Sequence, residues 1–530
     1  MKISVSLLLL FVAPFSAHSI EQTVLQPQQV VQKRIAIIGG GAAGTSAAFW
    51  ISNVFGNRIN VSTTLYERSD YLGGRSTVVP IKGDPKYGYI ELGASIFVPV
   101  NYNLMNATQR FNLTLTTLVD KNISEKIGVW DGQQFLFQES NSGWFDKVRA
   151  VWRYGLTPLK VKKLVSDVTS RWLKVYDNAP AFTNMDQLVK ALDLKREIEM
   201  TAANYYAAEK GLNERYLREI VQSATRVNYG QDLDELHALG SHISMAAAGA
   251  HSIKGGNFKI FEEFALRSRA DIRLDTVVKD IQTSVEYDDN CNSITQYILQ
   301  TSDGAMESFD AVIIAAPLVC HCPPHSFAFA VWIASNPFFS TAQQSTNLKS
   351  FRSPKYPKYK KIHVTLVAGR PNPTKFGKKI SNVPTTIVTT GAPYLEHFEN
   401  GTQPFTTFAQ HKFVKQTKET VVKMFSAKRM EEDELNRLFF ARSWTYRKQW
   451  DAYPELRTVG TADWMPIVLD GNTEDGIDTP GIFYVNSFES LFSTMESQTV
   501  ASKNIVRLLH QEWCTKEGDC PEFVDGWGLH

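Results

Sequence analysis

Apolar and polar positions near the start of the chain follow the order that a strand, a tight turn and a helix require. Arg34 leads into the apolar run Ile35–Ile38, which is followed by three glycines and then by small residues at helical spacing. A second run, Ile59–Tyr66, is rich in β-branched residues and ends at the acidic Glu67. This alternation of strand and helix patterns predicts a βαβ unit and a parallel sheet.

The spacing of apolar residues, about 3.6 residues in a helix and about two in a strand, divides the rest of the chain into helices and strands. Residues 125–245 are predicted to be mostly helical and amphipathic, whereas residues 322–475 alternate polar turns with runs rich in Val, Thr and Phe and predict a second, antiparallel sheet. The expected helices are Leu159–Tyr176, Met185–Leu194, Glu197–Lys210 and one that starts near Thr494 and continues to Val506. The further expected strands are Ala270–Val278, Asp310–Pro317, Lys361–Val367, Thr385–Thr390 and Gly481–Val485.

Length and charge limit the classes of function. The chain has 530 residues, enough for two domains or one large composite domain. Its formal charge of +2 provides no strong basic field, which argues against nucleic-acid binding. The apolar segment Phe327–Ala334 is too short to span a membrane and is interpreted as core, with a membrane-facing lip as the alternative.

The N-terminus has the pattern of a secretory signal. A positive start at Lys2 precedes the apolar run Ser6–Ala13, and Ala17 and Ser19 are small residues at the two cleavage-determining positions. We therefore predict a signal peptide over residues 1–19 and a protein of the secretory pathway, with the lysosome, the vacuole or the extracellular space as destination. An uncleaved membrane anchor is the alternative, and the run is short for one.

Five Asn-x-Ser/Thr sequons agree with this route. Asn60 lies inside the predicted strand Ile59–Tyr66, so we do not expect it to be used. The predicted glycosylation sites are Asn106, Asn112, Asn122 and Asn400.

The chain has too few cysteines, five, for a disulfide scaffold. Cys514 and Cys520 flank a short polar loop and are the most plausible bridge. The segment Cys320-His321-Cys322 is similar to a metal cluster at first sight. Structural metal sites space their cysteines by two or more residues, so we interpret this segment as a loop and predict no metal site.

Each glycine in the first turn has a separate task in binding a dinucleotide. Gly39 allows the turn, Gly41 lets the backbone approach a pyrophosphate, and Gly44 lets the helix pack closely on the strand. The N-terminus of the helix then offers N–H groups and the positive end of its dipole to the phosphates. Glu67 follows Gly44 by 23 residues, near the spacing of about 20 expected for an acid that binds a ribose hydroxyl.

A second glycine pair extends this motif. Gly73-Gly74-Arg75 supplies a close backbone approach and a fixed cation for a phosphate, and the strand pattern starting at Tyr89 ends in Gly93-Ala94-Ser95. Together these motifs resemble the flavin-binding oxidoreductases of the amine-oxidase and phytoene-desaturase type. The resemblance implies FAD as cofactor and an α/β fold, in which a Rossmann-like FAD-binding domain, discontinuous in sequence, is joined to an α+β substrate domain.

In that family a valine backbone meets the adenine, and Val277 or Val278 would take this role here. A Met-Glu pair at the start of the last helix lies near the flavin pyrimidine. The residues expected to bind FAD are therefore Gly39, Gly41, Ala42, Ala43, Gly44, Glu67, Arg68, Gly74, Arg75, Gly93, Ala94, Ser95, Val277, Thr494 and Met495.

Longer segments narrow the resemblance to prenylcysteine oxidases, also called prenylcysteine lyases. They are Trp152–Gly155, Arg226–Gln231, Lys254–Asn257, Asp310–Pro317 and Ser493–Glu496, and the likeness extends from about Arg34 to Leu509. It implies an FAD-dependent thioether oxidase of prenylated-protein breakdown. Such an enzyme cleaves farnesyl- or geranylgeranyl-cysteine with O2 and water to cysteine, an isoprenoid aldehyde and hydrogen peroxide. In such enzymes the hydride passes from the substrate to flavin N5, and that step needs no strong base. The resemblance therefore identifies no catalytic base in this chain.

The residues leave the substrate contacts open. Arg226 and Gln231 are candidates for holding the amino-acid end of the substrate, chosen on spacing and polarity. By residue chemistry alone, Trp152–Gly155 and Arg226–Gln231 are equally well read as helix ends with ordinary aromatic packing. His251 is a candidate for activating water, with a structural histidine as the simpler interpretation.

Two other functions compete with this one. A secreted flavin amine or polyamine oxidase shares the scaffold but needs an aromatic cage, which the sequence does not locate. A non-catalytic prenyl-binding protein of the Rab-escort type is cytosolic, and the signal peptide argues against it. The expected partners are a small prenylcysteine substrate and O2, without nucleic acid; a peripheral membrane contact and the oligomeric state stay open.

The resemblance and the patterns together divide the chain into seven parts. These are the signal peptide (1–19), the three parts of the FAD-binding domain (34–124, 246–320 and 478–510), the helical substrate region (125–245), the substrate domain with its antiparallel sheet (321–477) and the C-terminal tail (511–530).

Overall fold

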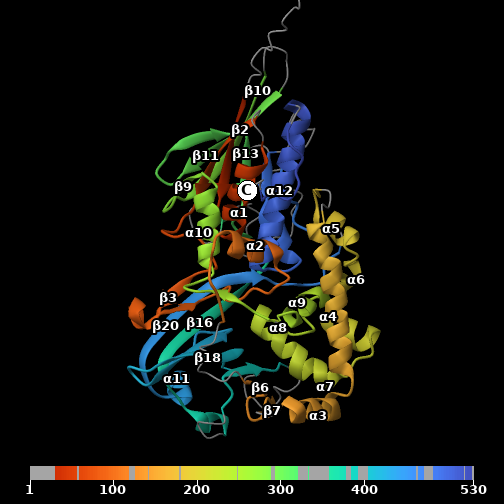
Figure 1. The fold of residues 1–530 in the computed structure, drawn as a ribbon, viewed down its shortest axis with the longest axis vertical. Helices are drawn as coiled ribbons and strands as arrows, with labels where there is room; N and C mark the ends of the chain where they lie inside the picture. Colours follow the sequence, from red (N-terminus) through yellow and green to blue (C-terminus); the bar gives the residue numbers. More distant parts are fainter. Residues whose placement is uncertain are drawn as a thin grey trace, which may run out of the picture.

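The computed structural model describes residues 30–55, 59–117, 126–140, 143–177, 181–247, 249–287, 293–319, 332–333, 357–377, 383–391, 404–460, 464–470, 481–517 and 520–527. A parallel sheet with its helices forms one end of the elongated molecule, and a second sheet and a group of helices form the other end (Figure 1). The predicted signal peptide, the Cys320–His325 segment and most of Phe327–Ala334 lie outside the described residues, as do Asn122 and Asn400.

A five-stranded parallel sheet carries the predicted nucleotide-binding motif. Its strands, in spatial order, are β21 (Ile482–Tyr484), β13 (Ala311–Ile314), β1 (Val31–Ile38), β2 (Ile59–Tyr66) and β9 (Asp271–Arg273). β13 is buried in all four residues and has parallel neighbours on both sides, as its continuous apolar run predicts. The α/β fold class is therefore confirmed.

Helices from both ends of the chain pack together beside this sheet. α1 (Ala42–Val54) contacts both α12 (Met495–Glu517) and α10 (Phe258–Arg267), while α2 (Tyr102–Arg110) packs on α10 and α12. Alanine and glycine on α1 allow the close approach, and Ser502 of α12 donates a hydrogen bond of 2.6 Å to the carbonyl of Ala43. α12 lies beside α1 in Figure 1, so the domain is discontinuous as predicted.

The second sheet has seven strands. In spatial order they are β20 (Phe439–Pro454), β16 (Tyr359–Pro371), β19 (Glu419–Ser426), β18 (Thr407–Val414), β17 (Thr386–Thr389), β6 (Ile127–Trp130) and β7 (Phe135–Gln138), with α11 (Glu432–Leu438) before β20. Its pairs are antiparallel except β17 with β6. β6 and β7 lie at the start of the region 125–245 predicted to be mostly helical. The second sheet therefore includes residues that precede the helices.

The helical region lies beside the second sheet (Figure 1), and α8 (Gln222–Tyr229) contacts β17. Its other helices are α3 (Gly143–Tyr154), α4 (Thr157–Leu173), α5 (Met185–Ala191), α6 (Lys195–Glu199), α7 (Glu214–Tyr216) and α9 (Ala238–Met245), with π-helical turns at Asn204–Glu209 and Leu217–Val221. The predicted helices Leu159–Tyr176 and Met185–Leu194 correspond to α4 and α5. The single helix predicted over Glu197–Lys210 is wrong, because Thr201 forms a β-bridge with His237 that interrupts it.

The predicted strand Ala270–Val278 is also divided. Asp275 has a φ of +52°, and the turn there carries the chain from β9 to a separate antiparallel sheet. That sheet contains β10 (Val278–Tyr287), β11 (Ser293–Thr301) and β12 (Met306–Phe309). Short two-stranded pairs complete the strands: β3 (Val78–Pro80) with β4 (Tyr89–Glu91), β5 (Leu115–Thr116) with β8 (Ser252–Ile253), and β14 (Leu318–Val319) with β15 (Trp332–Ile333).

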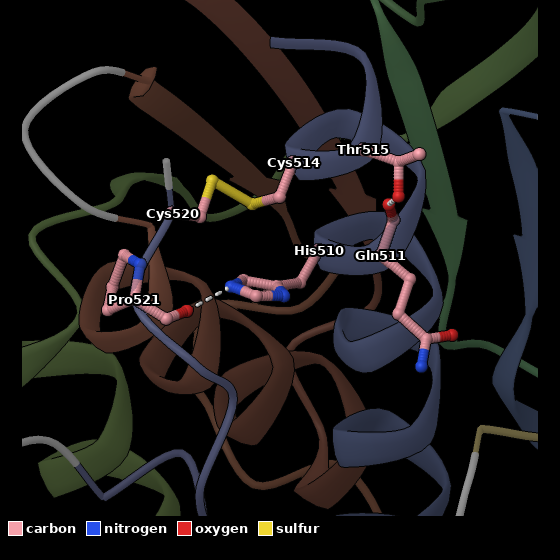
Figure 2. Close-up of a disulfide and its surroundings, with 6 residues drawn as sticks. All are labelled: His510, Gln511, Cys514, Thr515, Cys520 and Pro521. Carbon is pink, nitrogen blue, oxygen red and sulfur yellow. Dashed lines mark hydrogen bonds between the residues drawn. A yellow bond between two sulfur atoms is a disulfide. The ribbon is translucent and has the colours of Figure 1, made fainter. Parts of the chain in front are cut away.

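The end of the chain folds back onto α1. Cys514, in the last turns of α12, forms a disulfide with Cys520, as predicted, and His510 Nε2 lies 2.9 Å from the carbonyl oxygen of Pro521 (Figure 2). Beyond this bridge Trp527 packs edge-on against Trp50, with 4.8 Å between the ring centroids. The predicted tail is therefore part of the core around α1.

In the described part of the chain, no helix combines the length and the apolar character that crossing a bilayer requires. The domain boundaries given above stay predictions.

Candidate cofactor and active site

The turn after β1 is built on two glycines in contact. Gly39 has a φ of +108° and donates from its backbone N–H to the carbonyl of Tyr66 at 2.8 Å. A Cβ on Gly44 would lie 1.8 Å from the carbonyl oxygen of Gly39, so any side chain there would push α1 off the strand. Gly44 thus has the packing role that the motif predicts.

Gly41 and Gly74 leave a space at the N-terminus of α1. Gly73 donates to the carbonyl of Gly40 at 2.8 Å, which brings the two glycine segments side by side. A Cβ on Gly41 would meet, among described residues beyond its chain neighbours, Gly74 Cα at 3.9 Å. Gly41 is the N-cap of α1 and makes no side-chain cap, so the first N–H groups, including those of Ala42 and Ala43, point to this space. These features fit a dinucleotide pyrophosphate.

Glu67 stands at the end of β2, beside the same turn. The residue is 8% exposed, and its carboxylate accepts hydrogen bonds from the backbone N–H groups of Gly40 (2.7 Å) and Ser69 (2.8 Å). A carboxylate has about four acceptor positions, so two are available to ribose hydroxyls. Thr276 donates to the carbonyl of Glu67 at 2.9 Å, which places the neighbouring Val277 at the same edge. Arg68 follows directly and is exposed.

Arg75 forms an ion pair that the sequence did not predict. Its guanidinium contacts the carboxylate of Glu489 and donates to the carbonyl of Ala452 at 2.7 Å. Glu489 is fully buried and also accepts from the hydroxyl groups of Tyr359 and Ser493. The cation therefore links three parts of the fold. Its contact with a cofactor phosphate stays a prediction.

The N-terminus of α12 is capped in both directions, as expected for a helix that starts near Thr494. Thr494 Oγ1 accepts from the N–H of Ser497, and Ser497 Oγ accepts from the N–H of Thr494, both at 3.0 Å. Met495 is the first helical residue and is 7% exposed. The buried carboxylate of Glu496 instead receives the N–H groups of Asn103 and Leu104 and so caps α2.

The loop after β4 meets the second sheet. Lys423 of β19 donates from Nζ to Ser95 Oγ at 2.7 Å, and a Cβ on Gly93 would lie 2.6 Å from the Trp450 ring. Asn257 donates from its side chain to the carbonyl of Ala94 at 3.0 Å and from its backbone to Glu91 Oε1 at 2.6 Å. The predicted cofactor residues Gly93, Ala94 and Ser95 therefore lie where the two halves of the molecule join.

Two buried charges stand behind this loop. Burial raises the pKa of Glu91, and the hydrogen bond from the Asn257 backbone opposes that shift. Burial lowers the pKa of Lys423, against the attraction of Glu91. Glu91 Oε2 is buried and accepts no hydrogen bond from the described residues. The two charges attract each other, and each partly offsets the effect of burial on the other's pKa.

Lys423 and Glu489 were missed by sequence reasoning. Lys423 interrupts the apolar run of β19, and a lysine inside such a run is rarely buried without a partner, which is the signal that could have identified it. Glu489 has no comparable signal, because its partner Arg75 is 414 residues away.

The proposed substrate contacts have structural partners. Gln231 is 1% exposed, and its side-chain oxygen accepts the N–H of Leu456 at 3.0 Å. Arg226 pairs with Asp232 at 2.7 Å. The backbone of His251 pairs with that of Phe97. Among the described residues, none of these three side chains forms a hydrogen bond with the Gly93–Ser95 loop. Their roles in binding substrate or activating water therefore stay predictions.

The described residues include three of the sequons and one group of potential metal ligands. Asn106 and Asn112 are exposed, and their glycosylation stays a prediction; Asn60 is exposed too, on β2. In the described part of the chain, His510, Cys514 and Cys520 bring three potential metal-ligand atoms together. The two sulfur atoms are joined in the disulfide and cannot act as thiolates (Figure 2).

Solved structures show the same architecture. A putrescine oxidase variant with a redesigned cofactor site superposes with a TM-score of 0.52 and 12% identity, over 90% of this chain and 98% of that one. A CLA-producing fatty acid isomerase from P. acnes gives a TM-score of 0.54 and 14% identity, over 89% and 98%. At these identities the likeness concerns the fold.

Sequence comparisons are more specific. Farnesylcysteine lyase of Arabidopsis thaliana is 28% identical over 507 residues, covering 91% of this chain and 89% of that protein. Prenylcysteine oxidase 1 of Homo sapiens is 24% identical over 493 residues, with the same coverage. The NAD(P)-binding Rossmann-like domain family matches residues 37–111, and the prenylcysteine lyase family matches residues 137–521. Since that second match covers more than half of the sequence, the chain belongs to the prenylcysteine lyase family.

Proposed function

We propose that this protein is an FAD-dependent thioether oxidase that cleaves S-prenyl cysteine. The reaction consumes the thioether, water and O2 and yields free cysteine, the isoprenoid aldehyde and hydrogen peroxide. The carbon–sulfur bond breaks after water has added to the oxidised carbon, so that carbon leaves as the aldehyde. The substrate is a farnesyl- or geranylgeranyl-cysteine released when prenylated proteins are degraded.

One observation carries the proposal: the family match extends over residues 137–521, the part of the chain outside the first nucleotide motif. A shared Rossmann turn would indicate a dinucleotide and nothing of the substrate. Here the similarity includes the second sheet and the helical region, which in this fold form the substrate side. The named relatives act on farnesylcysteine and prenylcysteine.

FAD fits the residues that surround the glycine turn. The space between Gly41 and Gly74 and the uncapped start of α1 suit the pyrophosphate, and Glu67 suits a ribose. When bound, FAD supplies the oxidising equivalents for removing a hydride from the carbon beside sulfur, with O2 as final electron acceptor.

The chain's own groups supply position and charge. Lys423 holds a cation at the Gly93–Ser95 loop inside a buried junction, where electrostatic interactions are stronger than in water. Trp450 of β20 brings aromatic surface to the same junction, and Tyr453, further along β20, packs edge-on against the buried Tyr229 of α8 at 5.4 Å. Aromatic surface of this kind suits an isoprenoid tail. The protein thus binds, orients and shields the substrate.

The same proposal places the enzyme in the secretory pathway, with the lysosome or vacuole as the compartment where prenylated proteins are degraded. The N-terminal signal pattern and the sequons support this location. Immunofluorescence of the full-length protein, compared with a variant that lacks residues 1–19, tests it.

Anaerobic reduction by farnesylcysteine tests the reaction. We expect the flavin absorbance of the purified protein to bleach on addition of farnesylcysteine and to return, with hydrogen peroxide, when air is admitted. Putrescine is the matched control and should leave the flavin oxidised. Bleaching by putrescine alone would favour an amine oxidase, and tight binding of farnesylcysteine without bleaching would favour a prenyl-binding protein.

A further inference from the structure

α3 lies at one end of the molecule (Figure 1), and it and the start of α4 carry exposed apolar side chains. We call this set the α3 face; its members are Trp144, Val148, Val151, Trp152, Leu156 and Leu159. The four members within α3 recur at helical spacing and so share one side of the helix. Trp152 is 87% exposed, an unusual state for so large an apolar side chain.

The opposite side of α3 is firmly attached to the protein. Arg153 Nε and the hydroxyl of Tyr154 each donate to Glu219 at 2.8 Å, and Glu219 is fully buried. α4 buries Val161 and Trp172 against the rest of the molecule. These anchors fix which side of α3 faces solvent, so the exposure of the α3 face follows from packing.

Positive charge surrounds this face. α3 and α4 together contain seven Lys and Arg residues and two Asp residues, a formal charge of +5. Arg153 and Arg171 pair with the buried carboxylates of Glu219 and Glu197, which leaves a charge of +3 in a chain whose total is +2. Lys160, Lys162 and Lys163 are all exposed. An open hollow of about 450 Å³ next to the face is lined by Leu159, Lys162, Lys163, Ser166, Asp167 and Ser170.

We propose that the α3 face docks on an anionic lipid bilayer. Trp152 and Leu156 enter the interface between headgroups and acyl chains, and the lysines of α4 bind the anionic headgroups. Tryptophan is suited to this depth because its ring is apolar and its N–H is polar. A second copy of the chain fits this face less well, since a two-fold contact would place two positively charged surfaces against each other.

This surface goes beyond the proposed reaction and does not depend on it. Docking is measured by cosedimentation of the mature, FAD-loaded protein with vesicles, without any turnover. Vesicles of phosphatidylcholine and phosphatidylserine are compared with vesicles of phosphatidylcholine alone. We expect binding to the anionic vesicles that weakens with added salt.

Three variants separate the contributions. The double substitution Trp152→Ala, Leu156→Ala should reduce partitioning by at least about tenfold, because both apolar contacts are lost. The triple substitution of Lys160, Lys162 and Lys163 by Gln should abolish the preference for anionic vesicles. Leu266→Ala is the matched control; Leu266 is 70% exposed on α10, outside the α3 face, and its loss should change nothing.

FAD content and melting temperature verify that each variant is folded. The proposal is overturned if the unmodified protein does not sediment with anionic vesicles at low salt, or if the Trp152, Leu156 variant sediments equally well. It is also overturned if size-exclusion chromatography shows a dimer that this variant converts to a monomer, which would assign the face to self-association. An inactive enzyme that still binds vesicles would contradict the proposed reaction and leave this result standing.

Discussion

Lys423 and Ser95 join the seven-stranded sheet to the loop after β4 through one hydrogen bond. Lys423 Nζ donates to Ser95 Oγ at 2.7 Å, across 328 residues of sequence. The lysine is 4% exposed and lies on β19, while Ser95 ends the loop after β4 that is predicted to contact FAD. A cation is therefore held at the place where the cofactor side and the substrate side meet, and its removal is the most direct test of the proposed site.

We expect Lys423→Met to lower kcat for farnesylcysteine by at least about tenfold. The variant lacks the buried cation, which would stabilise the negative charge that bound FAD gains when it takes the hydride. FAD content should be unchanged, since the contacts around Gly41 and Glu67 remain. Steady-state peroxide assays and the flavin-to-protein absorbance ratio measure both. Lys412→Met is the control: Lys412 lies on the neighbouring strand β18 and bonds the carbonyl of Tyr87. Equal kcat values for the two variants would rule out this role of Lys423.

Two glycines of the first turn should respond differently to alanine. In Gly44→Ala the new methyl group collides with the Gly39 carbonyl, so we expect a loss of about 3 kcal/mol in unfolding free energy. In Gly41→Ala the methyl group enters the open space at the start of α1. That variant should unfold near the wild-type urea midpoint but bind FAD about tenfold more weakly. Urea unfolding and titration with FAD distinguish them, and identical behaviour of the two variants would contradict the assignment.

The Arg75–Glu489 pair should be costly to break from one side. Arg75→Met leaves the fully buried carboxylate of Glu489 without its cation, and we expect about 3 kcal/mol of destabilisation in urea unfolding. Combining it with Glu489→Gln, which removes the unpaired charge, should restore part of this loss. A double variant that is no more stable than Arg75→Met would show that the charge of Glu489 is not the cause.

Acid should destabilise the fold through buried histidines. Burial lowers the pKa of His237 to about 4 from 6.5; its Nδ1 accepts the N–H of Gly240, and Nε2 lies 3.2 Å from the carbonyl of Ser490. Between pH 6.5 and 4 the unfolded chain binds a proton that the folded chain does not, so stability falls as the pH falls. The contribution of His237 is about 2 kcal/mol at pH 5 relative to pH 7.

His237→Asn keeps a side-chain acceptor at the N-cap of α9 and removes the titrating ring. The difference in unfolding free energy between pH 7 and pH 5 should therefore be smaller in this variant by about that 2 kcal/mol. Urea unfolding at both pH values measures the difference. His242→Asn should act in the same direction, because burial lowers the pKa of His242 as well. An unchanged pH dependence in both variants would disprove the effect.

The parts of the site that depend on local geometry could be predicted from the sequence. Gly39 and Gly44 act on neighbours within one turn, and Glu67 ends a strand whose pattern is plain, so their roles follow from spacing and steric limits. The start of α12 at Thr494 was predicted for the same reason, since a cap is formed by residues three positions apart. The Cys514–Cys520 bridge closes a loop short enough to be recognised.

Contacts between distant segments could not be predicted in this way. Arg75 was expected to face a phosphate, and nothing near it in sequence indicates Glu489. The helix predicted over Glu197–Lys210 has good periodicity, yet the bridge between Thr201 and His237 interrupts it, because tertiary hydrogen bonds outweigh local propensity. The strands β6 and β7 likewise owe their state to pairing with β17 and with each other.

The position of α12 beside α1 has a consequence for how the protein is made. The predicted FAD site combines α1, which starts at Ala42, with α12, which starts at Met495, and Trp527 beyond α12 packs against Trp50 of α1. The ribosome synthesises these segments in order, so α1 is made long before its partner α12. We therefore expect FAD to bind after translation is complete, and we expect nascent chains that stop before α12 to be substrates of chaperones and quality control.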